Sequence, residues 1–286
     1  THVHVSDATA YKVFEQDSLF DKMALRQACS IHFPEADFSM LPKAFVNRAR
    51  LTSLSSDPCL ALTFSFRLND DGSLAEYKIK PTELKNVKRL SYETVDKALS
   101  KGDDDIVGLS SKEREMILTL ASIAEQRKQW RERQGYFRLN APQMSMRLGF
   151  HGAVDIDVRT PTAAMSLMRE LKEAAAELTA RFGIERNIEL PYVLRQSTKQ
   201  LDNGEEITQD KLDAWVQNYE NAPLSRYRRS SYTTNTASRS PFYASTAPAA
   251  LVPVTSPLHQ YRHVIVHRQI HLALSGQTPQ CGTELA

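Results

Sequence analysis

Four histidines recur at every fourth position near the end of the 286-residue sequence, at His259, His263, His267 and His271. On an α-helix a step of four residues advances about 400°, so neighbouring members lie about 40° apart on one face. Histidine pairs at this spacing bind Zn²⁺, but no thiol stands nearby in the sequence. We therefore favour histidines that are buried or face a ligand, with a zinc site as the alternative.

Carboxylates are paired at two further places. Asp155 and Asp157 alternate with valine and isoleucine in VDIDV and point to one face of an expected strand, where they could mimic a metal-binding pair. A solvated strand face is the interpretation we favour. The run Asp103-Asp104-Asp105 follows a glycine and predicts a surface turn.

Guanidinium and aromatic groups are interleaved between positions 131 and 138. Arginines that bind phosphates and aromatic rings that stack on bases are typical of single-stranded nucleic-acid binding. The alternative is that Trp130 and Phe137 lie in the core while the arginines are solvated. The interleaved residues are Arg131, Arg133, Tyr136, Phe137 and Arg138.

The net charge of +2 hides a strong asymmetry along the chain. From Asn221 to Thr283 there is no acidic residue, while six arginines and four histidines occur there. Such a tract suits contact with a polyanion or an acidic partner. No apolar run approaches the roughly 20 residues of a membrane-spanning helix, so we expect no membrane partner. Three widely spaced cysteines favour a reducing, intracellular compartment.

The periodicity of apolar residues predicts strands first and long helices later. Alternation predicts a strand at His2–Val5, a strand at Ser30–Phe33 and a hairpin that joins Leu60–Leu68 to Ala75–Lys80 through Asp71-Gly72. Shorter strands are expected at 136–139 and 154–158. This order of hairpins and helices favours an α+β fold.

Helices are expected where apolar residues recur on one face and capping residues precede them. Ser110 begins a capping box with Glu113. Gly183 and Gly276 are each expected to end the helix that precedes them. The expected helices cover 18–27, 91–99, 110–135, 161–182, 211–219 and 257–274.

The segment TSPLHQYRHVIVHRQI at Thr255–Ile270 resembles the TSPxRRYxDLxxHRQL hallmark of the ribonuclease II (RNB) family of 3′-to-5′ exoribonucleases. Other segments resemble family motifs in the family's order. They are HVHVSDATAY at 2–11, ALRQACSIHFP with MLP at 24–42, LTSL at 51–54, RLSYETV at 89–95 and RKQWR at 127–131. The resemblance implies an RNB-type catalytic-domain fold, with mixed sheets and packed helices, over residues 1–276. Residues 221–240 are expected to form an irregular basic loop within it, and 277–286 a C-terminal tail.

In that family carboxylates hold Mg²⁺, and an arginine neutralises charge on the phosphate. In the family, the DxxxxxDxDDA segment lies just before the strand that His2–Val5 resembles. In this sequence the resembling strand stands at the start. We therefore expect the metal-binding aspartates, part of the N-terminal segment and the flanking oligonucleotide-binding barrels to be missing from these residues, and no metal or other cofactor to be held by them.

The rest of the family's site is replaced at several positions. His259 and Gln260 stand where the two arginines of TSPxRRYxD belong, and His263 stands at the aspartate. In the upstream pattern HxxLGxxxYxxxTSP, Tyr243 replaces the histidine and Leu251 replaces the tyrosine. A neutral imidazole cannot grip phosphate as a guanidinium fork does.

These replacements predict a pseudoenzyme: an RNA-binding or scaffolding part of a ribonucleoprotein or other large assembly, with RNA and protein subunits as partners. An organellar location, mitochondrial or plastid, is the accompanying expectation. The alternative is an active Mg²⁺-dependent exoribonuclease whose aspartates lie outside this chain. A third hypothesis is a protein-interaction module with no affinity for RNA. The expected RNA-binding residues are Thr255, Ser256, Tyr261, Arg262, His267, Arg268, Arg131, Tyr136, Arg226, Arg228 and Arg229.

Overall fold

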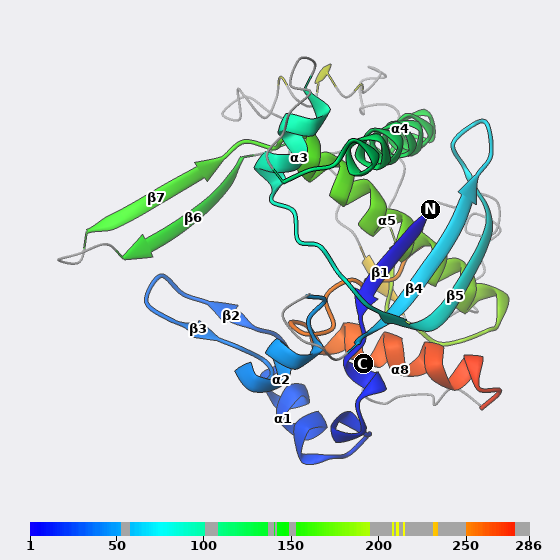
Figure 1. Cartoon of the computed structure of the whole chain (residues 1–286). Helices are drawn as coiled ribbons and strands as arrows, with labels where there is room; N and C mark the ends of the chain where they lie inside the picture. Colours follow the sequence, from blue (N-terminus) through cyan, green and yellow to red (C-terminus); the bar gives the residue numbers. More distant parts are fainter. Residues whose placement is uncertain are drawn as a thin grey trace, which may run out of the picture.

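The computed structural model describes residues 1–52, 58–100, 108–136, 140, 142–148, 153–194, 208, 210–211, 214, 231–233 and 250–277. Its fold is α+β, as expected, with small antiparallel sheets and packed helices (Figure 1). Among the described residues no helix is both long enough and apolar enough to cross a membrane.

The main sheet has three antiparallel strands in the order β1-β4-β5. The strands are β1 (His2–Ser6), β4 (Cys59–Leu68) and β5 (Leu74–Leu84), which confirms the predicted hairpin and lengthens its second arm. The turn between β4 and β5 contains Gly72 at φ 85°, a left-handed conformation that glycine adopts readily. Leu62 and Phe64 of β4 are fully buried, so the sheet supplies one wall of the main core.

Two 23-residue helices, α4 (Ser111–Arg133) and α5 (Ala163–Glu185), pack on each other beside this sheet. Ser110 caps α4 through the predicted box with Glu113. The prediction that α5 ends at Phe182 is wrong, because the helix continues through Gly183. A Cβ at Gly183 would lie 2.5 Å from the Tyr192 hydroxyl, so this glycine permits close packing and does not end the helix.

The last helix, α8 (Tyr261–Leu274), begins four residues later than predicted. Residues 257–259 form a turn, and Gln260 is extended and bridges to Cys29, so the backbone there pairs across to the N-terminal region instead of turning into a helix. One face of α8 adds Val266 and Ile270 to the main core. Another face contributes Tyr261, Val264 and Ile265, together with Leu258 of the preceding turn, to a second core shared with the N-terminal segment.

The N-terminal side of that second core is built from short elements. Helices α1 (Leu19–Gln27) and α2 (Lys43–Ala49) lie near α8, and the two-stranded pair β2 (Ile31–His32) and β3 (Asp37–Phe38) extends from them (Figure 1). Phe14, Leu41 and Phe45 are its large buried residues. The first fifty residues are thereby packed against the last described helix.

The remaining elements lie between and after the long helices. Helix α3 (Tyr92–Leu99) packs on α4 and α5. Strands β6 (Gln143–Leu148) and β7 (Val154–Arg159) form a two-stranded ribbon, of which only β7 was predicted. A small sheet has the order β10-β8-β9, from β8 (Tyr192–Leu194), β9 (Ser231–Thr233) and β10 (Ala250–Leu251). Most of the predicted strand 136–139 and helix 211–219 lies outside the described residues.

Candidate functional site

The turn that precedes α8 is held against the chain segment that follows α1. Ser30 donates its backbone N–H to the His259 carbonyl at 2.8 Å, and Tyr261 donates to the Ala28 carbonyl at 2.8 Å. The Ser30 hydroxyl also lies 3.3 Å from Nδ1 of His259. These contacts fix the orientation of the turn, which carries His259 and Gln260 in place of the two arginines of the family motif.

Asp21 of α1 joins two residues of α8. Its buried carboxylate accepts a hydrogen bond from the Tyr261 hydroxyl at 2.9 Å and one from Nη2 of Arg268 at 2.7 Å. Burial and the neighbouring Asp21 carboxylate raise the pKa of Tyr261 to about 12, so Tyr261 is a phenol at neutral pH. Tyr261 and Arg268 therefore position α8, and their polar groups are turned toward the protein.

Asp7, directly after β1, is fully buried, and its carboxylate accepts hydrogen bonds from Thr9 and His271. Thr9 donates its backbone N–H and its hydroxyl to Oδ1, and His271 donates Nε2–H to Oδ2 at 2.6 Å. His267 lies beside them, with its Nδ1 3.4 Å from Oδ1 of Asp7 and its Nε2 2.9 Å from the Val254 carbonyl oxygen. Burial alone raises the pKa of Asp7, but the hydrogen bonds from both histidines outweigh it and hold that pKa far below the usual range.

His263, at the family's aspartate position, lies in the interior. Its Nδ1 accepts a hydrogen bond from the Ser256 backbone N–H at 2.9 Å, so Nε2 carries the proton of the neutral ring. Burial, with Arg262 and His267 as nearby positive groups, lowers the pKa of His263 to about 3. Nε2 has no hydrogen-bond partner among the described residues. At neutral pH His263 is thus an uncharged, buried ring.

The solvent-facing part of this region is small. His259 and Arg262 are exposed, and Arg262 donates through Nε to the side-chain oxygen of Gln260 at 2.9 Å. Thr255 and Ser256 are half-buried, whereas His267 is enclosed. Of the expected RNA-binding residues on α8 and its preceding turn, Arg262 is the exposed cation.

Arg131 and Tyr136, which the sequence predicts as RNA-binding residues, are both buried. Arg131 forms ion pairs with Glu170 and Glu173 of α5, the latter at 3.1 Å. One turn earlier Arg127, also buried, pairs with Glu177 and donates to the Gly72 carbonyl at 2.8 Å. These arginines join α4 to α5 in the core and are not available to a ligand.

Other predicted positions lie in the core or on an exposed strand face. Leu251 is buried in β10 opposite Val193, so it is a core residue. Asp155 and Asp157 lie on one exposed face of β7, and Asp157 pairs with Arg159 at 2.8 Å. The remaining predicted positions lie outside the described residues: Arg226, Arg228, Arg229, Tyr243, Phe137, Arg138 and Asp103 to Asp105.

The described residues do not fit a Mg²⁺ or Zn²⁺ site. Asp7 and Asp21 already accept hydrogen bonds on both carboxylate oxygens. The four histidines do not converge, because His259 lies before the helix and His263 and His267 use ring nitrogens on backbone groups. No group of three or more His, Cys, Asp or Glu side chains is placed to hold a metal ion in the described part of the chain.

Asp7 and Asp21 are the residues that sequence reasoning missed. Asp7 stands inside the HVHVSDATAY motif, which is a signal in the sequence. Its role, however, depends on His267 and His271, which follow it by 260 and 264 positions. Asp21 lies on a short amphipathic helix and carries no pattern of its own.

The fold and this arrangement define an α+β domain in which α8 is tied to the N-terminal segment by two buried aspartates. Comparison with known families shows a match to the RNB domain over residues 1–276. The chain therefore belongs to the RNB domain family.

Relatives and solved structures agree with this assignment. An uncharacterised ribonuclease of Synechocystis is 27% identical over 275 residues, which cover 96% of this chain and 38% of that protein. Mycoplasma genitalium RNase R in complex with ribose-methylated single-stranded RNA has a similar fold, with a TM-score of 0.75, 17% identity and coverage of 96% of this chain and 46% of the other. Yeast Ssd1, a pseudonuclease, has a TM-score of 0.69 at 16% identity, with 99% of this chain and 37% of that chain covered.

The chain spans less than half the length of each of these proteins. Related ribonucleases also include a chloroplastic/mitochondrial form in Arabidopsis thaliana and a mitochondrial form in Schizosaccharomyces pombe.

Proposed function

We propose that this chain is a non-catalytic RNB domain that binds single-stranded RNA within a larger ribonucleoprotein assembly. The observation that carries the proposal is the chemistry of the turn before α8. Where the family motif has two arginines and an aspartate, this chain has His259, Gln260 and His263. Of these, His263 is a buried neutral ring whose Nδ1 accepts a hydrogen bond from Ser256.

The replaced arginines matter because phosphoryl transfer depends on neutralising charge in the transition state. An amide and a neutral imidazole cannot supply the bidentate, permanently charged grip of a guanidinium. Loss of one such contact lowers a rate by about 10²–10³-fold. Arg268, which matches the arginine of the HRQ part of the family motif, forms an ion pair with Asp21 and supplies no substitute.

RNA affinity, in contrast, needs exposed cations more than it needs precise transition-state geometry. Arg262 is exposed at the start of α8, where it donates to the side-chain oxygen of Gln260. The acid-free tract from Asn221 to Thr283 adds Arg226, Arg228 and Arg229 in sequence. Protein subunits as further partners and an organellar location belong to the same proposal, the latter supported by the organellar relatives.

The experiment incubates the purified chain with 5′-labelled single-stranded RNA and Mg²⁺. We expect retention of the RNA that weakens steeply with added salt, and no shortening from the 3′ end. Arg262→Ala should lower the affinity and reduce the salt slope by about one. Arg67→Ala removes an exposed arginine of β4 and serves as the matched control, which should change the affinity less.

The alternative function is an active Mg²⁺-dependent 3′-to-5′ exoribonuclease whose metal-binding aspartates lie outside this chain. The ribonuclease relatives favour it. Shortening of the RNA by the longer natural protein, lost on Asp→Asn substitution upstream of Thr1, would establish this alternative and overturn the non-catalytic proposal. Partner binding that is insensitive to salt, with no RNA retained, would indicate a protein-interaction module instead.

A further inference from the structure

The outer face of β1 carries two histidines whose rings lie side by side. His2 and His4 are both exposed, while Val3 between them packs against the main core. The centroids of the two rings are 6.2 Å apart, and the ring planes are inclined by 21°. Side chains two positions apart on a strand point to the same face, so both imidazoles are accessible to a single ligand.

Each ring is anchored through Nδ1 to a hydroxyl of β4. Nδ1 of His2 lies 2.8 Å from Oγ of Ser65, and Nδ1 of His4 lies 2.8 Å from Oγ1 of Thr63. These serine and threonine residues are the cross-strand partners of the two histidines. Nε2 lies on the other side of each ring, so both Nε2 atoms face away from β4. In the sheet order β1-β4-β5, this is the side of the edge strand.

A chain of hydrogen bonds determines which nitrogen of His4 carries the proton. The Thr82 hydroxyl lies 3.3 Å from the Ala61 carbonyl oxygen, and a carbonyl oxygen only accepts, so Thr82 donates there. Since a hydroxyl has one proton, Thr82 accepts its other hydrogen bond from the Thr63 hydroxyl. Thr63 in turn accepts from Nδ1–H of His4. Nε2 of His4 is therefore an unprotonated nitrogen that can bind a metal ion.

The surroundings of His4 keep its ring neutral. Partial burial and the neighbouring His2 lower the pKa of His4. The charged groups opposite are Lys78 and Lys80 of β5, which the width of β4 keeps about 9–10 Å from β1. Metal ions bind the neutral form of imidazole. At neutral pH His4 can therefore bind a metal ion without first losing a proton.

We propose that His2 and His4 bind one Cu²⁺ ion through their Nε2 atoms, with water in the remaining positions. Two nitrogens fall short of the three or four protein ligands that Zn²⁺ sites use. Nitrogen and oxygen ligands in a tetragonal arrangement suit Cu²⁺ and Ni²⁺, and Cu²⁺ has the highest affinity of the first-row divalent ions. Mg²⁺ takes oxygen ligands and is not expected here.

The two rings need a small adjustment to share one ion. Two nitrogens that each lie about 2.0–2.1 Å from one ion are about 3–4 Å apart, which is less than the 6.2 Å between the ring centroids. Both side chains are exposed, so each ring can tilt about its Nδ1 contact without displacing a core residue. The hydroxyls of Ser65 and Thr63 then orient the metal-binding imidazoles, as outer-shell partners do in metal sites.

The test measures Cu²⁺ binding to the full chain by equilibrium dialysis and electron paramagnetic resonance. The amino end is acetylated to remove a competing amine, and the acetylated N–H can still donate to the Phe66 carbonyl. We expect one Cu²⁺ per chain with the hyperfine pattern of two imidazole nitrogens, weaker binding of Zn²⁺ and no binding of Mg²⁺. His2→Ala and His4→Ala should each lower the affinity by about tenfold or more, and Thr63→Val by about 10–100-fold.

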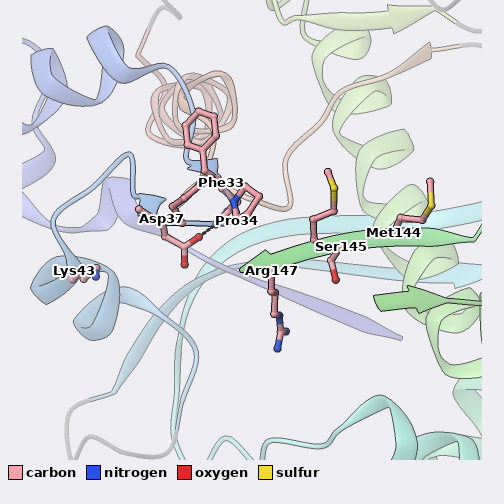
Figure 2. Close-up of a pocket in the computed structure, with 11 residues that line it drawn as sticks. Phe33, Pro34, Asp37, Lys43, Met144, Ser145 and Arg147 are labelled. Carbon is pink, nitrogen blue, oxygen red and sulfur yellow. Dashed lines mark hydrogen bonds and ion pairs between the residues drawn. The ribbon is translucent and has the colours of Figure 1, made fainter. Parts of the chain in front are cut away.

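His32→Ala is the matched control, because it removes an exposed histidine of another strand. His32 is hydrogen-bonded to Asp37 at 2.7 Å and lines a cleft of about 740 Å³ between the β2–β3 hairpin and the exposed Met144 and Met146 of the β6–β7 ribbon (Figure 2). This variant should bind Cu²⁺ as the parent chain does.

Three results would overturn the proposal. The first is Cu²⁺ affinity that survives either His2→Ala or His4→Ala, and the second is a spectrum with a single imidazole nitrogen. The third is an equal loss of affinity in His32→Ala, which would show adventitious binding to surface histidines. The histidine variants change exposed side chains and should keep the far-ultraviolet circular dichroism of the parent chain, so a loss of binding is not a loss of folding.

Discussion

The Asp7 carboxylate accepts a hydrogen bond from Nε2 of His271 at 2.6 Å, across 264 residues of sequence. This contact and the neighbouring one to His267 tie the end of the first strand to the last described helix. Asp21 repeats the arrangement with Tyr261 and Arg268 on the same helix. The turn that carries His259 and Gln260 is thus positioned by the N-terminal segment.

Asp7→Asn should lower the free energy of unfolding by about 3–5 kcal/mol, because it removes one partner of a buried, hydrogen-bonded ionic cluster. Urea denaturation monitored by circular dichroism measures the change. Asp155→Asn makes the same chemical change on the exposed face of β7 and should alter stability by less than about 0.5 kcal/mol. Similar losses in the two variants would show that Asp7 does not hold α8.

Stability should fall as the pH is lowered from 7 to 5, partly through His263. Burial lowers its folded-state pKa to about 3, while an unfolded histidine has a pKa near 6.5. Below pH 6.5 the unfolded chain therefore binds a proton that the folded chain does not, and at pH 5 this costs about 2 kcal/mol.

His263→Asn isolates that contribution, since the amide oxygen can still accept from the Ser256 N–H but does not titrate. The difference in unfolding free energy between the parent chain and this variant should change by about 2 kcal/mol between pH 7 and pH 5. A pH-independent difference would show that folding does not lower the pKa of His263.

Arg131→Ala should destabilise the protein by about 3–5 kcal/mol, because it removes the cation that pairs with the buried Glu170 and the half-buried Glu173. Its RNA affinity should match that of the parent chain at a temperature where both are folded. Arg133→Ala changes an exposed arginine two residues further along α4; it is the control and should cost less than about 1 kcal/mol. A stable Arg131→Ala variant with weakened RNA binding would restore Arg131 as a contact residue.

Gly72→Ala should destabilise the protein more than Gly108→Ala, although both glycines have φ near +85°. A Cβ at Gly72 would lie 2.5 Å from the Gln126 carbonyl oxygen of α4, whereas a Cβ at Gly108 meets nothing within 4 Å. We expect an additional loss of about 1–3 kcal/mol at Gly72. Thermal unfolding of the two variants side by side provides the comparison, and equal midpoints would contradict the close approach.

Local signals in the sequence were sufficient for most elements. Alternation predicted β1, β4 and β5, and the Ser110–Glu113 capping box located the start of α4, because both depend on residues a few positions apart. Gly183 misled the same reasoning, since a glycine needed for close packing by Tyr192 looks like a helix terminator when only neighbours in sequence are considered.

The candidate site shows the same difference between what neighbouring residues in the sequence predict and what only the folded structure shows. The sequence by itself determined the family, through ordered motifs, and the replacement of arginines by His259 and Gln260, because residue identity needs no coordinates. Only the tertiary structure decided that Arg131 and His267 are buried, that Asp7 and Asp21 hold α8, and that the β6–β7 ribbon exposes an apolar face. Burial and ion pairing are set by residues far apart in the chain, and they appear only when the chain is folded.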